Sequence, residues 1–178
     1  MLIDLIIRAV ADYAVIVIVL VAAFSLIVYT PKGKRLESYA RILMAGLTAY
    51  MLAKFVATIY QPAELRPFEL LGMEAGASYL NNPGFPSDHA LFVTAITAAV
   101  WFETRKKGIS LLLVGLTLAV CIGRVLALVH TPLDVIGGVL IALVGALWYS
   151  NLPRRQEKHG DGKSHSKRRD RRRSTVVG

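Results

Sequence analysis

Long apolar stretches alternate with short polar connections over most of the chain. The apolar stretches occupy residues 13–29, 42–60, 89–102, 110–129 and 135–149. An α-helix needs about 20 residues, and at the shortest about 17, to cross the hydrocarbon core of a bilayer. The two shortest stretches reach that length when the residues beside them extend the helix. The pattern therefore predicts an all-α integral membrane protein, a bundle of about five transmembrane helices.

Composition divides the chain into two parts. Hydrophobic residues make up 54% of the 178, yet the formal net charge is +9, so apolar and basic residues must be segregated. Residues 153–178 contain almost no large apolar side chain and carry the run KRRDRRR. Such a segment cannot bury enough surface to fold alone. We predict a transmembrane domain over residues 1–152 and a disordered polybasic tail over residues 153–178.

The basic residues also predict an orientation. Besides the tail, they gather at residues 32–41 and 105–107, and five spans would place all three groups on one side. The positive-inside rule makes that side cytoplasmic, so the N-terminus faces outward. Residues 61–88 would also face outward, since they contain a single basic residue, Arg66. Their prolines and glycines break helices and predict a long outer loop between the second and third helices.

The tail is expected to contact the membrane. A polybasic segment beside a membrane helix attracts anionic lipid at about 1 kcal/mol per basic residue. Such a segment could also bind nucleic acid without sequence preference, but we favour lipid contact and a role in topology.

Charged residues also interrupt the first apolar helix. Asp4, Arg8 and Asp12 recur at every fourth position, which places them on one stripe of that helix. We interpret the stripe as the sign of a helix whose first turns lie at the membrane interface. The alternative is a role in substrate entry.

Ionisable side chains within membrane spans are costly and indicate function by default. Lys54, Arg124, His130 and Asp134 are such residues, and all lie near predicted outer helix ends. Lys54 has an alternative explanation, because a lysine can extend its ammonium group to the interface. Arg124 lies deeper, where that explanation is weaker.

His130 and Asp134 flank a Thr-Pro step that suits the start of the fifth helix. A separation of four residues brings two side chains together on a helix. A carboxylate beside one imidazole nitrogen fixes the tautomer and leaves the other nitrogen free to attack or to bind a proton. The two residues are therefore a candidate catalytic pair, although a His and an Asp at this spacing often occur by chance.

The sequence PSDH, residues 86–89, directly precedes the third predicted helix. Ser87 or Asp88 makes a good N-cap, which is the purely structural interpretation. Free N–H groups at a helix start also form an anion site. In that case His89 lies at the edge of a phosphate pocket.

The candidate residues share one surface and suit a phosphate better than a metal. Their cations are Lys54, Arg66 and Arg124, and the lone Cys121 cannot build a thiolate zinc site. Two histidines suit phosphoryl transfer, in which one attacks phosphorus and the other protonates the leaving oxygen. No metal and no cofactor is expected.

These residues resemble the three signatures of the type 2 phosphatidic acid phosphatase family, at residues 54–67, 86–89 and 124–134. The third, RVLALVHTPLD, has the family's spacing of arginine, histidine and aspartate. In the second, Asp88 stands where many members have glycine, a form that resembles the bacterial undecaprenyl diphosphate phosphatase branch.

The resemblance implies catalytic roles for three residues. His130 would be the nucleophile that forms a phosphohistidine, Asp134 would orient it, and His89 would be the general acid. The phosphate-binding residues implied are Arg124, Arg66, Ser87, Asp88 and Lys54. The implied reaction is metal-independent hydrolysis of undecaprenyl diphosphate to the monophosphate at the outer face of a bacterial plasma membrane.

The chain departs from the family pattern in three respects. Eleven residues separate Lys54 from Arg66 where six are common, and Gly123 precedes Arg124 where serine is common. Many members also have six spans, against the five predicted here.

Three alternatives remain at this stage. A phosphatase of the same family could act on phosphatidylglycerol phosphate or phosphatidate, because residues that hold a phosphate do not recognise the lipid tail. A non-catalytic membrane scaffold is the second, and it is disfavoured because both histidines and Asp134 are present. A channel or transporter is disfavoured because the chain has no internal repeat.

Overall fold

The computed structural model describes residues 2–62, 65–80, 82 and 84–150. Every element within these ranges is helical, and no strand occurs in them. The elements are α1 (Leu2–Arg8), η1 (Ala9–Tyr13), α2 (Ala14–Tyr29), η2 (Lys32–Lys34), α3 (Arg35–Ile59), α4 (Pro67–Leu70), α5 (Asp88–Thr104), α6 (Lys107–Leu126), α7 (Pro132–Gly145) and η3 (Ala146–Tyr149). The predicted tail, residues 153–178, lies outside the described residues.

Four of the helical stretches are long and apolar enough to cross a membrane. They are Leu2–Tyr29, Lys32–Ile59, Lys107–Leu126 and Pro132–Tyr149. Large apolar side chains point outward from all four, with Leu20, Leu47, Leu118 and Leu140 each about half exposed or more. Apolar surface of this extent marks a membrane-facing protein. The prediction of an all-helical membrane protein is confirmed for the described residues, with four helices suited to crossing a bilayer.

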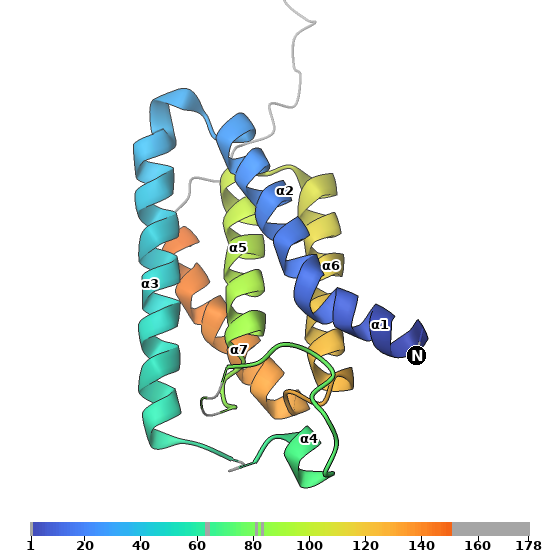
Figure 1. Ribbon diagram of the computed structural model, residues 1–178. Coiled ribbons are helices and arrows are strands. Elements are labelled where there is room, and N and C mark those ends of the chain that lie inside the picture. The colour runs from blue at the N-terminus through green and yellow to red at the C-terminus, as the bar shows by residue number, and fades with distance from the viewer. Residues whose placement is uncertain (1, 63–64, 81, 83, 151–178) are drawn as a thin grey trace, which may run out of the picture.

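The remaining predicted span, the third along the chain, is α5, which has 17 residues and is too short to be counted with the other four. It lies at the centre of the bundle and packs against α2, α3, α6 and α7 (Figure 1). Its buried positions include Ala90, Val93 and Val100. The count of about five spans therefore stays a prediction.

Small residues bring the helices together closely. Ala49 and Ala53 of α3 share a buried cluster with Ala142 of α7, as is usual where membrane helices pack. Gly138 of α7 lies against the start of α5, where a Cβ atom would come within 2.6 Å of the Ser87 carbonyl oxygen. No larger residue fits at position 138 unless α5 moves, so this glycine positions the start of α5.

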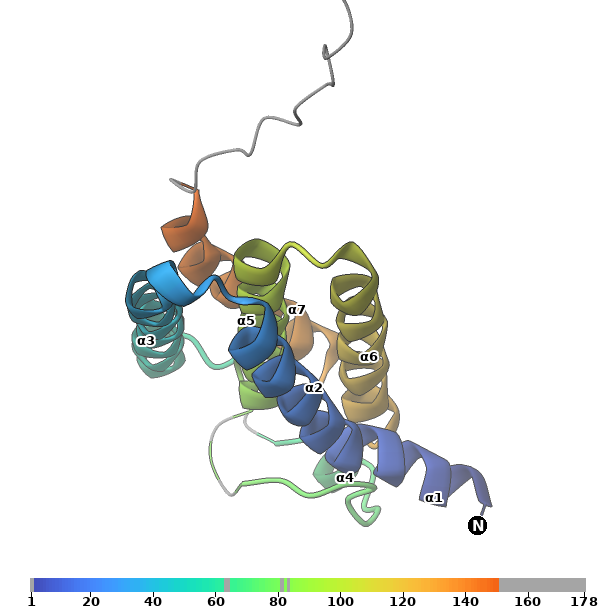
Figure 2. The ribbon, with the colours of Figure 1, turned by 90° about the horizontal axis from the view of Figure 1, so that it is seen from above.

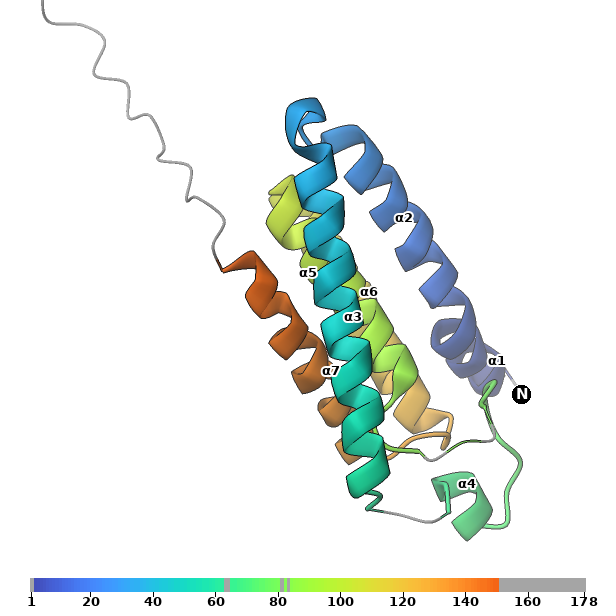
Figure 3. The same ribbon diagram turned by 90° about the vertical axis from the view of Figure 1, so that its left-hand side faces the viewer.

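The two ends of the bundle differ in character. The connection between α3 and α5, which includes α4, covers one end, and the connection between α6 and α7 reaches the same end (Figures 1 and 3). The other end carries the α2–α3 and α5–α6 connections, with the basic residues Lys32, Lys34, Lys106 and Lys107. Seen from above, α1 extends sideways beyond the bundle (Figure 2), and none of its residues is buried.

Candidate active site

The chain between α6 and α7 presents His130 at the covered end of the bundle. Leu128 reverses the backbone there with φ at 58°, a value that is rare for a branched side chain. Thr131 then caps α7, and its hydroxyl accepts a hydrogen bond of 3.2 Å from the Asp134 N–H. Pro132 occupies the first helical turn, as the sequence predicted. These local features fix where His130 leaves the backbone.

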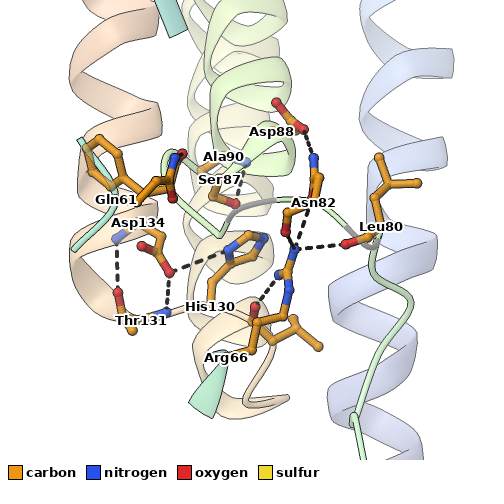
Figure 4. A network of polar contacts seen from close by, with 12 residues as sticks. Gln61, Arg66, Leu80, Asn82, Ser87, Asp88, Ala90, His130, Thr131 and Asp134 are labelled. Carbon is orange, nitrogen blue, oxygen red and sulfur yellow. Dashed lines mark hydrogen bonds and ion pairs between the residues drawn. The ribbon is translucent and has the colours of Figure 1, made fainter. Parts of the chain in front are cut away.

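Asp134 lies directly beside His130. Its Oδ2 is 3.6 Å from His130 Nδ1, and both residues are buried. The same Oδ2 accepts a hydrogen bond of 2.7 Å from the Thr131 N–H (Figure 4). Nδ1 has no partner within hydrogen-bond distance among the described residues. The two side chains predicted to pair are therefore adjacent, at a separation slightly longer than a hydrogen bond.

The surroundings keep the His130 imidazole neutral. Burial is the main cause that lowers the pKa of His130 from its ordinary value of 6.5, and the guanidinium groups of Arg124 and Arg66 lower it further. The Asp134 carboxylate opposes this shift. A neutral imidazole has a free lone pair on one nitrogen, which is the form that can attack an electrophile.

Arg66 links the α3–α5 connection to the residue before His130. Its Nη1 donates a hydrogen bond of 2.6 Å to the Val129 carbonyl oxygen. Its Nη2 donates to the carbonyl oxygens of Leu80 and Asn82, at 2.9 and 3.0 Å (Figure 4). The side chain is buried at 8% exposure. Arg66 thus brings its charge into the site while most of its hydrogen bonds go to the protein backbone.

Arg124 is the most deeply buried cation at this end of the bundle. Only 1% of it is exposed, and its Nη1 lies 3.1 Å from Oδ1 of Asp12 in η1. Its Nε has no hydrogen-bond partner within the described ranges. A buried N–H without a partner is costly and calls for an explanation, such as a ligand that the structure does not contain.

The sequence did not identify Asp12 as a site residue. It drew attention to Asp12 through the four-residue repeat with Asp4 and Arg8, but the repeat alone suggested an interfacial helix. The pairing with Arg124 joins residues 112 positions apart, and no local pattern predicts it.

The residues of the PSDH motif lie at the start of α5. Ser87 is fully buried, and its hydroxyl accepts the Ala90 N–H at 3.5 Å, so it is the N-cap of α5. Its own N–H donates to the Asp134 carbonyl oxygen at 2.9 Å. His89 is half-buried in the first turn, close enough to His130 for the two to interact electrostatically. The motif and the His130 segment are therefore joined by a direct hydrogen bond.

Lys54 reaches this motif despite its long spacing from Arg66. Its Nζ lies 3.2 Å from Oδ1 of Asp88, and both side chains are partly exposed. The side-chain amide of Asn82 donates to Oδ2 of the same carboxylate at 3.4 Å. Every residue predicted for the site thus lies at one end of the bundle. Within the described part of the chain, no group of three His, Cys, Asp or Glu side chains is placed to hold a metal ion.

The sequence is similar to those of two known proteins. The chain is 30% identical over 110 residues to a protein named undecaprenyl-diphosphatase BcrC from Bacillus subtilis (strain 168), a region that covers 61% of this chain and 55% of that protein. It is 30% identical over 131 residues to the bacitracin transport permease protein BcrC from Bacillus licheniformis, covering 71% of this chain and 62% of that protein. The chain thus spans somewhat more than half the length of these relatives. No solved structure matches it significantly.

A match to a protein-family profile identifies the family. The PAP2 superfamily profile matches residues 38–158, a range that contains all three motifs and the residues gathered around His130. The family resemblance inferred from those motifs is confirmed. Because the match covers more than half of the chain, the chain belongs to the PAP2 superfamily.

Proposed function

We propose that this protein is a membrane lipid phosphatase that uses His130 as its nucleophile. The observation that carries the proposal is the environment of His130, a buried imidazole 3.6 Å from the Asp134 carboxylate and under the electrostatic influence of Arg66 and Arg124. A neutral histidine beside two guanidinium groups suits attack on an anionic phosphoryl group, because the cations stabilise charge on the transferring oxygens. Membership of the PAP2 superfamily supports the same chemistry.

The reaction would proceed in two steps. With Nδ1 directed at Asp134, the lone pair on Nε2 attacks phosphorus, and the bond from phosphorus to the leaving oxygen breaks. His89 donates a proton to that oxygen, which leaves as an alcohol or a monophosphate. Water then attacks the phosphohistidine, passes a proton to His89, and releases inorganic phosphate and free His130. No step in this sequence requires a metal.

Different parts of the site would hold the phosphoryl oxygens. Arg124 would donate through its unpaired Nε, and Arg66 would contribute charge because its hydrogen bonds are mostly taken by the backbone. The Ser87 hydroxyl and the first N–H groups of α5 add an anion site at a helix N-terminus. Lys54 would exchange Asp88 for a phosphate oxygen when substrate enters, because this pair is partly exposed and therefore weak.

The substrate that we favour is a polyprenyl diphosphate such as undecaprenyl diphosphate, cleaved to the monophosphate. The similarity to a relative named undecaprenyl-diphosphatase supports this choice, as does the aspartate in the PSDH motif. A phosphatidylglycerol phosphate or phosphatidate phosphatase is the alternative within the superfamily. A non-catalytic scaffold is disfavoured because it would not need a buried histidine surrounded by cations.

We also propose that α5 crosses the membrane, which brings the number of spans to five. In this arrangement the site faces outward and the C-terminus lies in the cytoplasm. The central position of α5 supports the span count. The gathering of the basic connections at the end opposite His130 supports the orientation. The tail, residues 153–178, would then contact anionic lipid on the cytoplasmic side, and nucleic-acid binding is disfavoured.

Site-directed labelling in intact cells tests the orientation, since a cysteine introduced at Ser78 should react with an impermeant maleimide in a Cys121→Ala background.

The experiment that tests the activity is phosphate release by detergent-purified protein with EDTA present. Undecaprenyl diphosphate and phosphatidate are offered separately and in competition. Wild type is compared with His130→Ala and with His159→Ala, a matched histidine substitution in the tail. We expect release that survives EDTA, is abolished in His130→Ala and is unchanged in His159→Ala. Folded wild-type protein that releases no phosphate from any lipid would overturn the proposal and favour the scaffold.

A further inference from the structure

Asp12 connects three separate parts of the molecule. Its Oδ1 lies 3.1 Å from Nη1 of Arg124, whose side chain is 1% exposed. Its Oδ2 accepts hydrogen bonds from Ser78, at 3.0 Å from the backbone N–H and 2.8 Å from the hydroxyl. One carboxylate therefore joins the N-terminal helix, the α3–α5 connection and the buried arginine of α6.

The local backbone is shaped to make this contact. Ala9–Tyr13 form a π-helical turn between α1 and α2, an irregularity that is frequent at functional sites. The turn packs against α6 at Gly123, where a Cβ atom would lie 3.2 Å from the Ala11 backbone nitrogen and 3.3 Å from the Ala11 Cα atom. The glycine next to Arg124 thus allows the π turn to come close enough for Asp12 to reach the guanidinium group.

We propose that Asp12 is a positioning residue, which holds Arg124 in the orientation needed to bind the phosphoryl group. The inference rests on the proposed function. Asp12 occupies Nη1, and Nε of Arg124 has no hydrogen-bond partner among the residues that the structure describes, so one side of the guanidinium group is anchored while another stays available for a phosphate oxygen. An arginine aligned in advance loses less freedom when the substrate binds, and it stabilises transition-state charge without rearrangement.

The contact between Asp12 and Ser78 also positions the α3–α5 connection. Asp12 thus holds both the α3–α5 connection and Arg124 against the π turn η1. A carboxylate that only stabilised the fold would change the melting temperature but not the turnover of folded protein. A positioning residue changes kcat more than KM, since Arg124 contributes most where charge develops on the transferring phosphoryl group in the transition state.

The test uses full-length protein in detergent and the substitutions Asp12→Asn, Asp12→Glu, Gly123→Ala and Asp4→Asn. Asp12→Asn keeps the shape of the side chain but replaces one carboxylate oxygen with an NH2 group, which removes the charge opposite Arg124. Asp12→Glu restores the charge. Gly123→Ala removes no polar group and instead pushes the π turn away from α6. Asp4→Asn is the matched control, because it neutralises an aspartate of the same helix away from Arg124.

We expect Asp12→Asn to lower kcat of the folded protein for the lipid diphosphate by roughly tenfold, with KM nearly unchanged, and to lower the melting temperature because the buried Arg124 loses its counter-charge. This loss is smaller than the effect of removing a transition-state donor outright, which is about 100-fold or more. Gly123→Ala should reproduce the loss, Asp12→Glu should recover part of it, and Asp4→Asn should behave as wild type. Wild-type kcat in Asp12→Asn would overturn the inference, as would a loss that only follows the melting temperature.

Binding of orthovanadate, measured by calorimetry, separates this inference from the proposed function. If wild type turns over no lipid, the proposed function fails, and the vanadate affinities decide the role of Asp12. Weaker vanadate binding in Asp12→Asn than in Asp4→Asn would still support positioning of Arg124. Equal affinities, or no binding to any of the proteins, would overturn it.

Discussion

Oδ2 of Asp134 lies 3.6 Å from Nδ1 of His130 and at the same time accepts a 2.7 Å hydrogen bond from the Thr131 N–H. The carboxylate that faces the imidazole is thus also part of the capping box at the start of α7. The helix start holds the carboxylate in place, and the carboxylate in turn limits how the imidazole can rotate. Helix capping and orientation of the proposed nucleophile therefore depend on one side chain.

Replacement of Asp134 by asparagine should separate these two roles. The amide oxygen can still accept the Thr131 N–H, so the cap survives, but the charge beside His130 is lost. We expect kcat to fall by about 100-fold to 10,000-fold, as in other sites where an aspartate orients a catalytic histidine. The measurement is steady-state turnover of the lipid diphosphate, together with the melting temperature.

Thr131→Ala is the matched control for that substitution. It removes the hydroxyl that accepts the Asp134 N–H and should lower the free energy of unfolding by about 1 kcal/mol. Turnover by the folded fraction should stay close to wild type. If Thr131→Ala loses as much kcat as Asp134→Asn, the carboxylate acts through the helix start alone.

The pKa of His130 predicts the acidic limb of the pH profile. Because burial lowers this pKa below 6.5, the imidazole stays neutral until the pH falls below that value. Protonation then removes the attacking lone pair, so kcat/KM should fall with a midpoint below pH 6.5. An acidic midpoint above pH 6.5 in wild type would contradict the assignment of His130 as a buried, neutral nucleophile.

The same shift has a consequence for stability. The unfolded chain binds a proton at His130 near pH 6.5, whereas the folded chain binds it only at lower pH. The stabilising contribution is therefore present above pH 6.5 and is lost as the pH falls through the folded pKa. Melting temperatures of wild type and His130→Gln should converge as the pH is lowered below 6.5, and a difference independent of pH would contradict the shift.

Arg66 should not tolerate lysine. Its guanidinium group donates to backbone oxygens of Val129, Leu80 and Asn82, and one ammonium group cannot match that forked geometry. We expect Arg66→Lys to lower the free energy of unfolding by about 1–3 kcal/mol, the cost of leaving a buried acceptor unpaired. The α3–α5 connection should become easier to cleave with protease. Arg41→Lys, which changes an arginine at the opposite end, is the control, and equal cleavage of the connection in both variants would refute the linking role.

Lys54 should affect substrate binding more than folding. Its partner Asp88 and the lysine itself are partly exposed, at 36% and 43% of their side chains, and exposed pairs contribute little to stability. We expect Lys54→Met to raise KM for the diphosphate several-fold, with the melting temperature nearly unchanged. Lys34→Met, at the other end of the bundle, is the comparison. An unchanged KM in Lys54→Met would mean that Lys54 does not reach the phosphate.

Local patterns in the sequence were sufficient to predict the helices and one candidate catalytic pair, His130 and Asp134. Apolar stretches as long as a bilayer is thick identify spans, and a spacing of four residues after a Thr-Pro step brings Asp134 beside His130. Both features are local in the sequence, since a span lies within about 20 consecutive residues and the pair is four residues apart. The sequence also grouped the candidate residues at one end, because each lies near the outer end of a predicted span or in an outer connection.

How those residues meet depends on packing between elements that are far apart in the sequence. Arg66 bonds to Val129 across 63 positions, and Asp12 reaches Arg124 across 112. Such contacts depend on how closely two helices approach, and Gly123 shows that a single missing Cβ atom sets that distance. Sequence periodicity fixes the direction of a side chain around its own helix, whereas its partner on another helix is determined by packing between the two.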